Sequence, residues 1–141
     1  MSLIECKAGK FEGLFENGCH HFFGIPYASY DQRWDESILI QDELVFKAVK
    51  RGNAAPQTRS NDQGQLGTSF FQDNSLSKQS EDCLTLNICS NDIKAKNPVM
   101  IWIHGGALVT GGSSSIMYDL QHLANRGVVI VSINYRLGPL G

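Results

Sequence analysis

Two apolar runs stand out in the second half of the chain, and the first, Val99–Ile103, ends abruptly at His104-Gly105-Gly106. A short apolar run that ends in glycines is typical of a strand buried on both faces. Such a strand usually carries a loop to the carboxyl edge of a parallel sheet, where α/β proteins place their chemistry. Paired glycines allow positive φ angles and let backbone N–H groups approach a ligand closely. The pattern therefore predicts a buried strand that presents backbone donors.

The rest of residues 81–141 predicts further strands around this one. Apolar and polar residues alternate over Leu84–Cys89, which is typical of a half-buried strand. The second apolar run, Val128–Ile133, predicts another buried strand after Val99–Ile103.

A helix is expected between the last two of these strands. Ser114 or Ser115 is a candidate N-cap, and Gly127 is a stop signal. Strand, helix and strand at this spacing form a right-handed βαβ unit, which makes the two strands parallel. The apolar positions that recur at helical spacing are Ile116, Leu120, Leu123 and Ala124.

Turn signals divide residues 1–28 into an antiparallel meander. Ala8-Gly9 is one turn, and Asn17-Gly18 is a strong signal for a tight hairpin. The segment then closes at Pro26, because proline cannot donate to a strand ladder. The predicted strands are Leu3–Cys6, Lys10–Glu16 and Cys19–Gly24.

Two stretches leave alternatives open. Leu44, Ala48 and Val49 fit one face of a short helix, whereas Ile38–Ile40 fits a strand equally well. Residues 52–80 form a long polar loop, which is either a disordered surface loop or a flap over a cleft anchored by Phe70-Phe71.

Composition narrows the class of protein. The chain has 141 residues, enough for one domain, with 42% hydrophobic and 18% charged residues. Its net charge of -2 argues against nucleic acid or an anionic membrane as the main partner. No apolar run approaches the roughly 18 residues that span a bilayer, and no signal-peptide pattern is expected.

The cysteines indicate reduced thiols. Cys6, Cys19, Cys83 and Cys89 form no C-x-x-C pair and show no metal-ligand spacing with the histidines. The chain also has no N-x-S/T sequon. We therefore expect a cytoplasmic protein with no metal and no cofactor.

Four segments carry a resemblance to a known family. They are Gly24–Ala28 (GIPYA), Ser80–Asn87 (SEDCLTLN), His104–Ala107 (HGGA) and Asn134–Gly138 (NYRLG). In this order and spacing they resemble type-B carboxylesterases, the cholinesterase-like branch of the α/β hydrolases, and most of all the bacterial para-nitrobenzyl esterase type. The similarity covers nearly all of this chain but only about the first quarter to third of such an enzyme. It implies a partial α/β-hydrolase fold: an amino-terminal antiparallel meander and the first βαβ unit of the central mixed sheet.

The resemblance assigns a role to the glycine loop. It implies that the backbone N–H groups of Gly106 and Ala107 stabilise the oxyanion of ester hydrolysis, with His104 and Gly105 supporting the loop. A plain strand-to-helix turn is the alternative for the loop, and a general base is the alternative for His104. The resemblance also implies a structural ion pair between Arg33 and Glu81.

The chain has no candidate nucleophile. A serine elbow requires G-x-S-x-G, and Gly111–Ser115 has serine where the last glycine is needed. By the resemblance, the serine, acid and histidine of the triad lie beyond Gly141, so we expect a portion of a carboxylic-ester hydrolase that is inactive alone. The alternatives are a truncated, non-catalytic paralogue that acts as a binding module and a fragment without an independent role.

Two further expectations follow from the resemblance. Ala55 stands where the family commonly has a cysteine paired with the one at Cys83, so that partner is lost. In the family's strand order, the neighbour of Val99–Ile103 on one side is absent from this chain. We therefore expect Val99–Ile103 to form an open apolar edge that self-associates or docks with the missing remainder.

Overall fold

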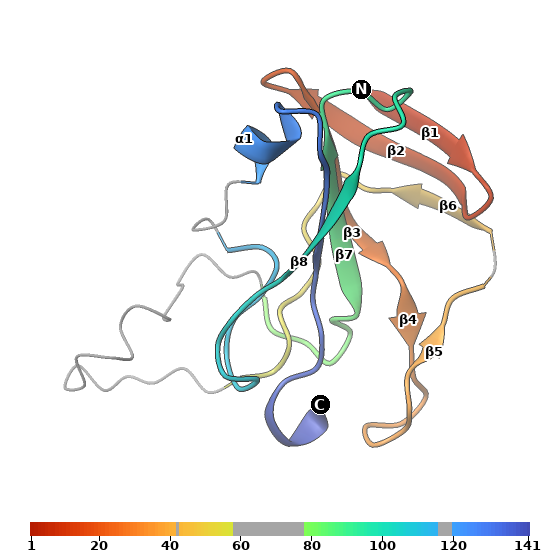
Figure 1. Cartoon of the computed structure of the whole chain (residues 1–141). Helices are drawn as coiled ribbons and strands as arrows, with labels where there is room; N and C mark the ends of the chain where they lie inside the picture. The colour runs from red at the N-terminus through yellow and green to blue at the C-terminus, as the bar shows by residue number, and fades with distance from the viewer. Residues whose placement is uncertain (42, 58–77, 116–119) are drawn as a thin grey trace, which may run out of the picture.

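A mixed β-sheet forms the centre of the molecule (Figure 1). The computed structural model describes residues 1–41, 43–57, 78–115 and 120–141. The main path of the sheet runs in the order β1-β2-β3-β7-β9-β8, and β6 pairs with β2 off this path. The elements are β1 (Ser2–Cys6), β2 (Gly9–Glu16), β3 (Cys19–Pro26), β4 (Ala28–Ser29), β5 (Ile38–Leu39), β6 (Leu44–Lys47), β7 (Thr85–Ser90), β8 (Val99–Ile103), α1 (Gln121–Ala124), β9 (Val129–Ile133) and a 3-10 turn (Gly138–Leu140).

The first three strands form the antiparallel meander that the turn signals predict. β1 pairs with β2 from Ser2 opposite Gly13 to Cys6 opposite Gly9, and β2 pairs with β3 across the Asn17-Gly18 turn. The β3 strand then pairs antiparallel with β7, which joins the meander to the second half of the chain. One continuous sheet therefore carries both halves.

The βαβ prediction is confirmed for β8, α1 and β9. β8 and β9 are parallel in full register, and β9 pairs antiparallel with β7 on its other side. The described helix begins at Gln121 with Leu120 at its N-cap, so neither Ser114 nor Ser115 caps it. The helix ends before Gly127, as predicted, and the Gly127 N–H donates to Ala124 O. The expected start of the helix, residues 116–119, lies outside the described residues.

No helix forms in the described part of residues 31–51, so the helical interpretation of Leu44 and Ala48 is wrong. Leu44–Lys47 is instead strand β6, which runs parallel to β2 with Leu44 opposite Gly9. The strand interpretation of Ile38–Ile40 is correct at Ile38–Leu39, which pairs with β4. Pairing with strands far away in sequence decides both segments.

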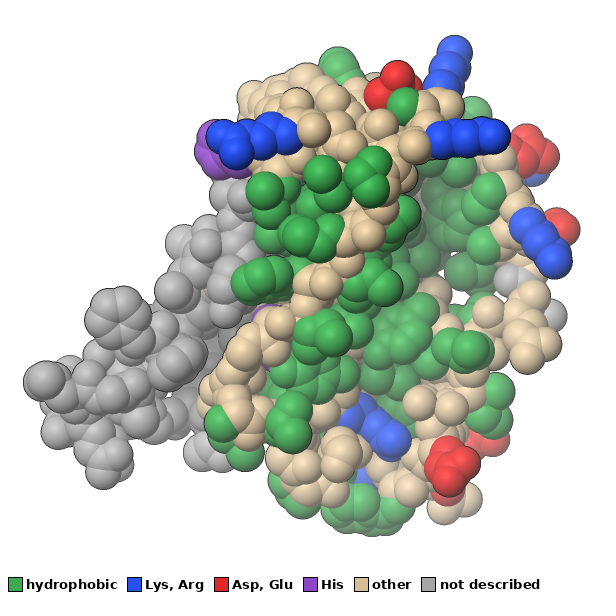
Figure 2. Space-filling view, viewed as in Figure 1, with side chains coloured by type: hydrophobic (Ala, Val, Ile, Leu, Met, Phe, Trp, Pro, Cys, Tyr) green, Lys and Arg blue, Asp and Glu red, His purple; other side chains and the backbone are tan. Residues whose placement is uncertain are grey.

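The two faces of the sheet are covered differently. On one face α1 packs over Cys19, Cys89 and Ile130. On the other face a cavity of about 620 Å³ is lined by apolar side chains of the meander, β6 and β7, among them Phe11 and Phe22. Figure 2 shows hydrophobic side chains gathered along β8 and across the surface beside it. Within the described residues, no helix is long and apolar enough to cross a membrane.

The β8 strand occupies the edge of the sheet, so the prediction that it is buried on both faces is wrong. Its side chains alternate, and Val99, Ile101 and Ile103 are 63, 62 and 63% exposed. The apolar run is real, but among the described residues no element covers this face of β8. The prediction of an open apolar edge describes the strand correctly.

Candidate active site

The loop that follows β8 has an unusual backbone. Gly106, Ala107 and Leu108 have φ angles of 127°, 52° and 61°. The value at Gly106 suits glycine alone, since a Cβ there would lie 1.9 Å from Thr110 O. Alanine and leucine in the left-handed region cost free energy, and residues in such conformations cluster at functional sites. The loop is therefore a strained turn at the carboxyl end of an edge strand.

Hydrogen bonds at Gly106 O fix the direction of the Ala107 N–H. The carbonyl accepts from Val109 N and Thr110 N, both at 3.0 Å, and from Thr110 Oγ1 at 3.3 Å. The peptide between Gly106 and Ala107 is planar and trans, so its N–H points away from the carbonyl that these donors hold. Among the described residues, the Ala107 N–H has no acceptor.

The preceding peptide is held by His104. His104 Nδ1 lies 2.9 Å from Gly105 O, and since a carbonyl only accepts, Nδ1 carries the proton. This contact fixes the peptide between Gly105 and Gly106 and thereby the direction of the Gly106 N–H. That N–H also has no acceptor among the described residues. Two consecutive backbone donors are thus oriented in advance and left available.

His104 is itself buried and oriented by its surroundings. Its ring stacks on Tyr135 with 4.4 Å between ring centroids, and Tyr135 Oη donates to His104 O at 2.6 Å. Burial lowers the pKa of His104, and the hydrogen bond with Gly105 opposes this effect. The imidazole is therefore buried and bonds its own loop, and the supporting role that the resemblance implies stays a prediction.

Gln57 fixes the far end of the loop at Gly111. Gln57 Nε2 donates to Gly111 O at 2.9 Å, and Gly111 N donates to Gln57 Oε1 at 2.9 Å. Gly111 has a φ of 109°, and a Cβ there would lie 2.5 Å from both Gly105 O and His104 Nδ1. The two ends of the loop are therefore in contact with each other.

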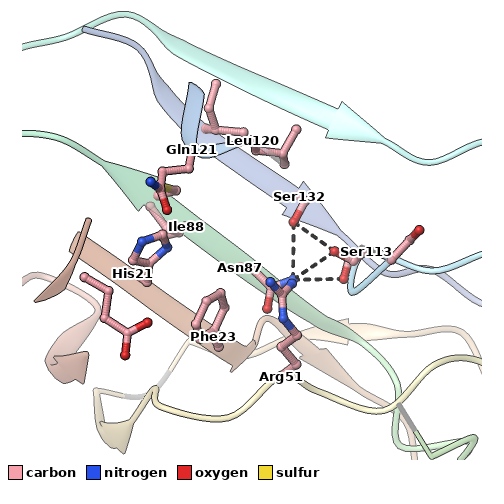
Figure 3. Close-up of a pocket in the computed structure, with 13 residues that line it drawn as sticks. His21, Phe23, Arg51, Asn87, Ile88, Ser113, Leu120, Gln121 and Ser132 are labelled. Atoms are coloured by element: carbon pink, nitrogen blue, oxygen red, sulfur yellow. Dashed lines mark hydrogen bonds between the residues drawn. The ribbon is translucent and has the colours of Figure 1, made fainter. Parts of the chain in front are cut away.

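Two asparagines fix the chain that leaves the loop. Asn134 Oδ1 accepts from Ser113 N at 2.7 Å, and Asn87 Nδ2 donates to Ser113 Oγ at 3.1 Å and to Ser132 Oγ at 3.2 Å. Figure 3 shows the Asn87, Ser113 and Ser132 side chains converging beside a cavity of about 320 Å³. Asn87 Oδ1 also accepts from Gly24 N at 3.0 Å. The loop is thus anchored to β3, β7 and β9.

Comparisons with known proteins decide the family. A model of the carboxylesterase family matches residues 2–141. The chain belongs to the carboxylesterase family. It is 39% identical to the para-nitrobenzyl esterase of Bacillus subtilis (strain 168) over 145 residues, which cover 99% of this chain and 28% of the relative. Phenmedipham hydrolase of Pseudarthrobacter oxydans is 33% identical over 144 residues, covering 99% and 29% of the two chains.

Solved structures of esterases agree with the sheet described above. An esterase from Clostridium hathewayi, reported to hydrolyze aliphatic aromatic polyesters, superposes with a TM-score of 0.83 at 36% identity and covers 100% of this chain and 28% of that one. A solved para-nitrobenzyl esterase gives a TM-score of 0.80 at 36% identity. The fold is a partial α/β-hydrolase fold, and the chain spans less than a third of the length of these relatives.

The segments that resemble carboxylesterases contact one another in the structure. Tyr27 Oη donates to Asn134 O at 2.7 Å. Arg33 Nε lies 2.8 Å from Glu81 Oε1, and the hydrogen bond from Arg33 lowers the pKa of Glu81. The guanidinium carbon of Arg136 lies over the ring of Tyr30, which follows the segment Gly24–Ala28, at 5.0 Å from the ring centroid. These contacts hold the segments together and belong to the framework rather than to the loop.

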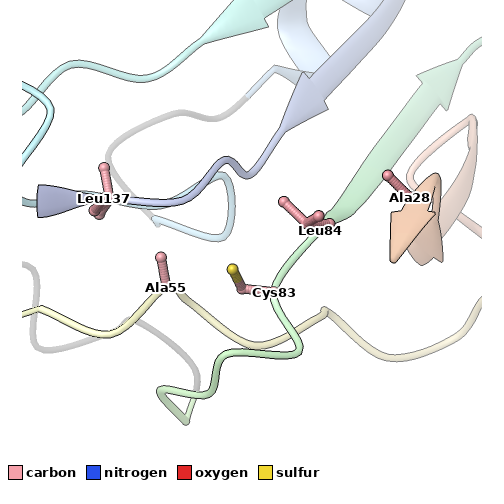
Figure 4. Packing of buried hydrophobic residues seen from close by; sticks show 5 residues of the cluster. All are labelled: Ala28, Ala55, Cys83, Leu84 and Leu137. Atoms are coloured by element: carbon pink, nitrogen blue, oxygen red, sulfur yellow. The ribbon is translucent and has the colours of Figure 1, made fainter. Parts of the chain in front are cut away.

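Cys83 lies in the apolar cluster that Ala28, Ala55, Leu84 and Leu137 complete (Figure 4). The cysteine is fully buried, and its side chain faces the Ala55 methyl group. Burial is the largest cause that raises the pKa of the Cys83 thiol to about 11. All four cysteines are free thiols. Ala55 thus packs beside the thiol at the position where the resemblance implies a cysteine in the family.

The described residues contain no complete nucleophile and base. Ser113, Ser114 and Ser115 are 4, 4 and 5% exposed, and Ser113 is held by the two asparagines. Within the same residues, no group of three or more His, Cys, Asp or Glu could hold a metal ion. Within the described residues, the loop after β8 therefore offers backbone N–H donors and no nucleophile.

Sequence reasoning missed the residues that hold the loop. Asn87 and Asn134 stand in segments quoted for the resemblance, and Gln57 lies two residues after Ala55, yet no sequence pattern connects these three residues to the glycines. Their partners lie 54, 26 and 21 residues away. No local signal marks such residues, because a carboxamide that satisfies the groups of a distant peptide looks like any other amide in the sequence.

Proposed function

We propose that this chain supplies the oxyanion hole of a serine carboxylic-ester hydrolase. The observation that carries the proposal is the pair of consecutive N–H groups at Gly106 and Ala107, oriented by bonded carbonyls and without acceptors among the described residues. The Gly106 and Ala107 donors, as we name this pair, lie at the end of β8, where the carboxyl edge of the sheet begins.

Donors fixed before the reaction suit the tetrahedral intermediate of ester hydrolysis. As the ester carbonyl is attacked, negative charge develops on its oxygen, and donors that need no reorganisation stabilise that charge. Loss of one such donor typically lowers kcat about 10²- to 10³-fold. The names of two relatives, para-nitrobenzyl esterase and carboxylesterase 3, support a carboxylic ester as the substrate class.

The proposal includes the absence of turnover by this chain alone. Its serines beside the loop are buried, and the resemblance places the nucleophile beyond Gly141. Oxyanion-hole donors without a triad leave a residual catalysis of about 10³ to 10⁴ over water in a complete enzyme. We expect even this to be lost where the rest of the acyl pocket is absent.

A chimera tests both parts. This chain would replace the matched segment of the Bacillus subtilis para-nitrobenzyl esterase, and hydrolysis of para-nitrophenyl acetate would be measured for the chimera and for the chain alone. Turnover by the chimera with none by the chain is the expected result. A folded but inactive chimera would contradict the first part, and serine-dependent turnover by the chain alone would contradict the second. Ester binding without turnover in the chimera would favour a non-catalytic binding module.

We also propose an association surface at the β8 edge and a cellular location consistent with the free thiols. Self-association, or docking with the remainder of an esterase, is supported by the edge position of β8 and by its exposed apolar side chains. A reducing, cytoplasmic location is supported by four cysteines that are all free thiols.

A further inference from the structure

Gln57 forms a reciprocal pair of hydrogen bonds with the backbone of Gly111. One side-chain amide satisfies both the N–H and the C=O of that residue, each at 2.9 Å. Among side chains in their usual ionisation state near neutral pH, only a carboxamide places a donor atom and an acceptor atom side by side in this way. A carboxylate would place two acceptors there and would face Gly111 O with like partial charge. The contact therefore depends on the amide and not only on the size of the side chain.

Gln57 is held from its own side. The backbone N–H of Gln57 donates to Gln79 Oε1 at 3.2 Å, and its side-chain Nε2 also donates to Ala55 O at 3.1 Å. Ala54 and Gln79 form a β-bridge, with Ser80 N donating to Ala54 O at 3.0 Å. Residues 54–57 are thus hydrogen-bonded to residues 78–80, and these contacts fix the position of Gln57.

Gly111 transmits the position of Gln57 to the donors. The space a Cβ would need at Gly111 is taken by Gly105 O and His104 Nδ1, so the Gly111 backbone packs directly on the peptide that carries the Gly106 N–H. If Gly111 moved, the peptide between Gly105 and Gly106 could rotate. The Gly106 N–H would then no longer point toward the proposed oxyanion. The Ala107 peptide, held by Thr110 next to Gly111, would follow.

We propose that Gln57 is a positioning residue for the Gly106 and Ala107 donors. The inference rests on the proposed oxyanion role for its effect on catalysis, whereas the contact with Gly111 can be tested without any activity. Gln57 touches neither donor and acts through Gly111. Misplacing a catalytic group by about 1 Å can cost about 10²-fold in rate, so we expect kcat to report the loss of this contact.

The catalytic test uses the chimera described above with Gln57→Glu and the matched control Gln32→Glu, which makes the same chemical change at an exposed position. With active sites counted by titration, Gln57→Glu is expected to lower kcat about 10- to 100-fold and to change KM by less than about twofold. A trifluoromethyl ketone, which becomes an oxyanion when the serine adds to it, should lose affinity by the same factor. A competitive inhibitor that forms no oxyanion should bind the Gln57→Glu chimera with unchanged affinity. Equal kcat per titrated site in the two variants would overturn the proposal.

Amide exchange in the 141-residue chain is the second readout. The Gly111 N–H is expected to be protected, and Gln57→Met, which keeps the length of the side chain, should speed its exchange at least about tenfold while Ala124 in the distant helix exchanges as before. Unchanged exchange at Gly111 would overturn the positioning role whatever the chimera does. An inactive parent chimera with the expected exchange result would contradict the proposed function alone.

Discussion

Replacing Gly106 by alanine tests how tightly the loop is constrained. The new Cβ would lie 1.9 Å from Thr110 O, which is backbone, and the residue would sit at a φ of 127°. Since a Cβ cannot approach a backbone oxygen this closely, either Gly106 or Thr110 has to move. Such a movement breaks the hydrogen bonds that Val109 N and Thr110 N donate to Gly106 O.

The expected cost is a large part of the stability of a domain this size. A residue forced into a disfavoured backbone conformation costs about 1 to 3 kcal/mol, and each lost backbone hydrogen bond about 1 kcal/mol. Together these predict a loss of about 4 kcal/mol, against domain stabilities of about 5 to 15 kcal/mol. At a urea dependence of about 2 kcal/mol per molar, the unfolding midpoint should fall by about 2 M.

Gly105→Ala is the matched control for this measurement. It lies next to Gly106 in the same loop, but a Cβ there meets nothing within 4 Å. Substituting a glycine where the conformation and space permit usually raises stability by about 0.4 to 1 kcal/mol, because the unfolded chain loses freedom. Urea unfolding of the chain followed by circular dichroism should therefore show opposite shifts. Equal midpoints for the two variants would refute the reasoning from loop geometry.

Three further predictions concern the edge, the ion pair and the thiols. Ile101→Lys at the centre of β8 is expected to reduce self-association by light scattering at high micromolar concentration, and a monodisperse monomer of the unsubstituted chain would contradict the edge proposal. Arg33→Met should be less stable than the unsubstituted chain at neutral pH. Because Arg33 lowers the pKa of Glu81 below its ordinary 4.5, this difference should vanish as the pH falls through that lowered pKa. A difference that stays undiminished once Glu81 is protonated would argue against it. Iodoacetamide followed by mass spectrometry should label exposed Cys6 in the folded chain and Cys83, whose pKa is raised to about 11, only after denaturation; equal labelling rates would contradict the burial of Cys83.

The strands that depend on local signals could be predicted from the sequence. The Asn17-Gly18 turn fixes the meander, and the apolar runs around a helical segment fix the βαβ unit, because each signal lies within the element it specifies. β6 could not be predicted in this way, since Leu44–Lys47 becomes a strand through parallel pairing with β2 about 35 residues earlier in the chain.

The residues of the candidate site likewise include some that a local signal predicts and others that act only through distant contacts. The glycines of the loop could be identified in the sequence, because a backbone position with a positive φ favours glycine over other residues. Its supports, Gln57 and Asn134, were not, because an amide that bonds a distant backbone looks like any surface amide. The apolar run alone wrongly predicted a buried β8, since such a run specifies what a strand could bury and not which elements are present to cover it. The open edge was predicted only through the strand order that the resemblance implies.

The most direct test of the central claim is a crystal structure of the chimera with a trifluoromethyl ketone bound to its serine. The account predicts that the oxygen of the tetrahedral adduct lies about 2.7 to 3.1 Å from both Gly106 N and Ala107 N. An adduct oxygen that points away from these two nitrogens, with the loop otherwise unchanged, would contradict it.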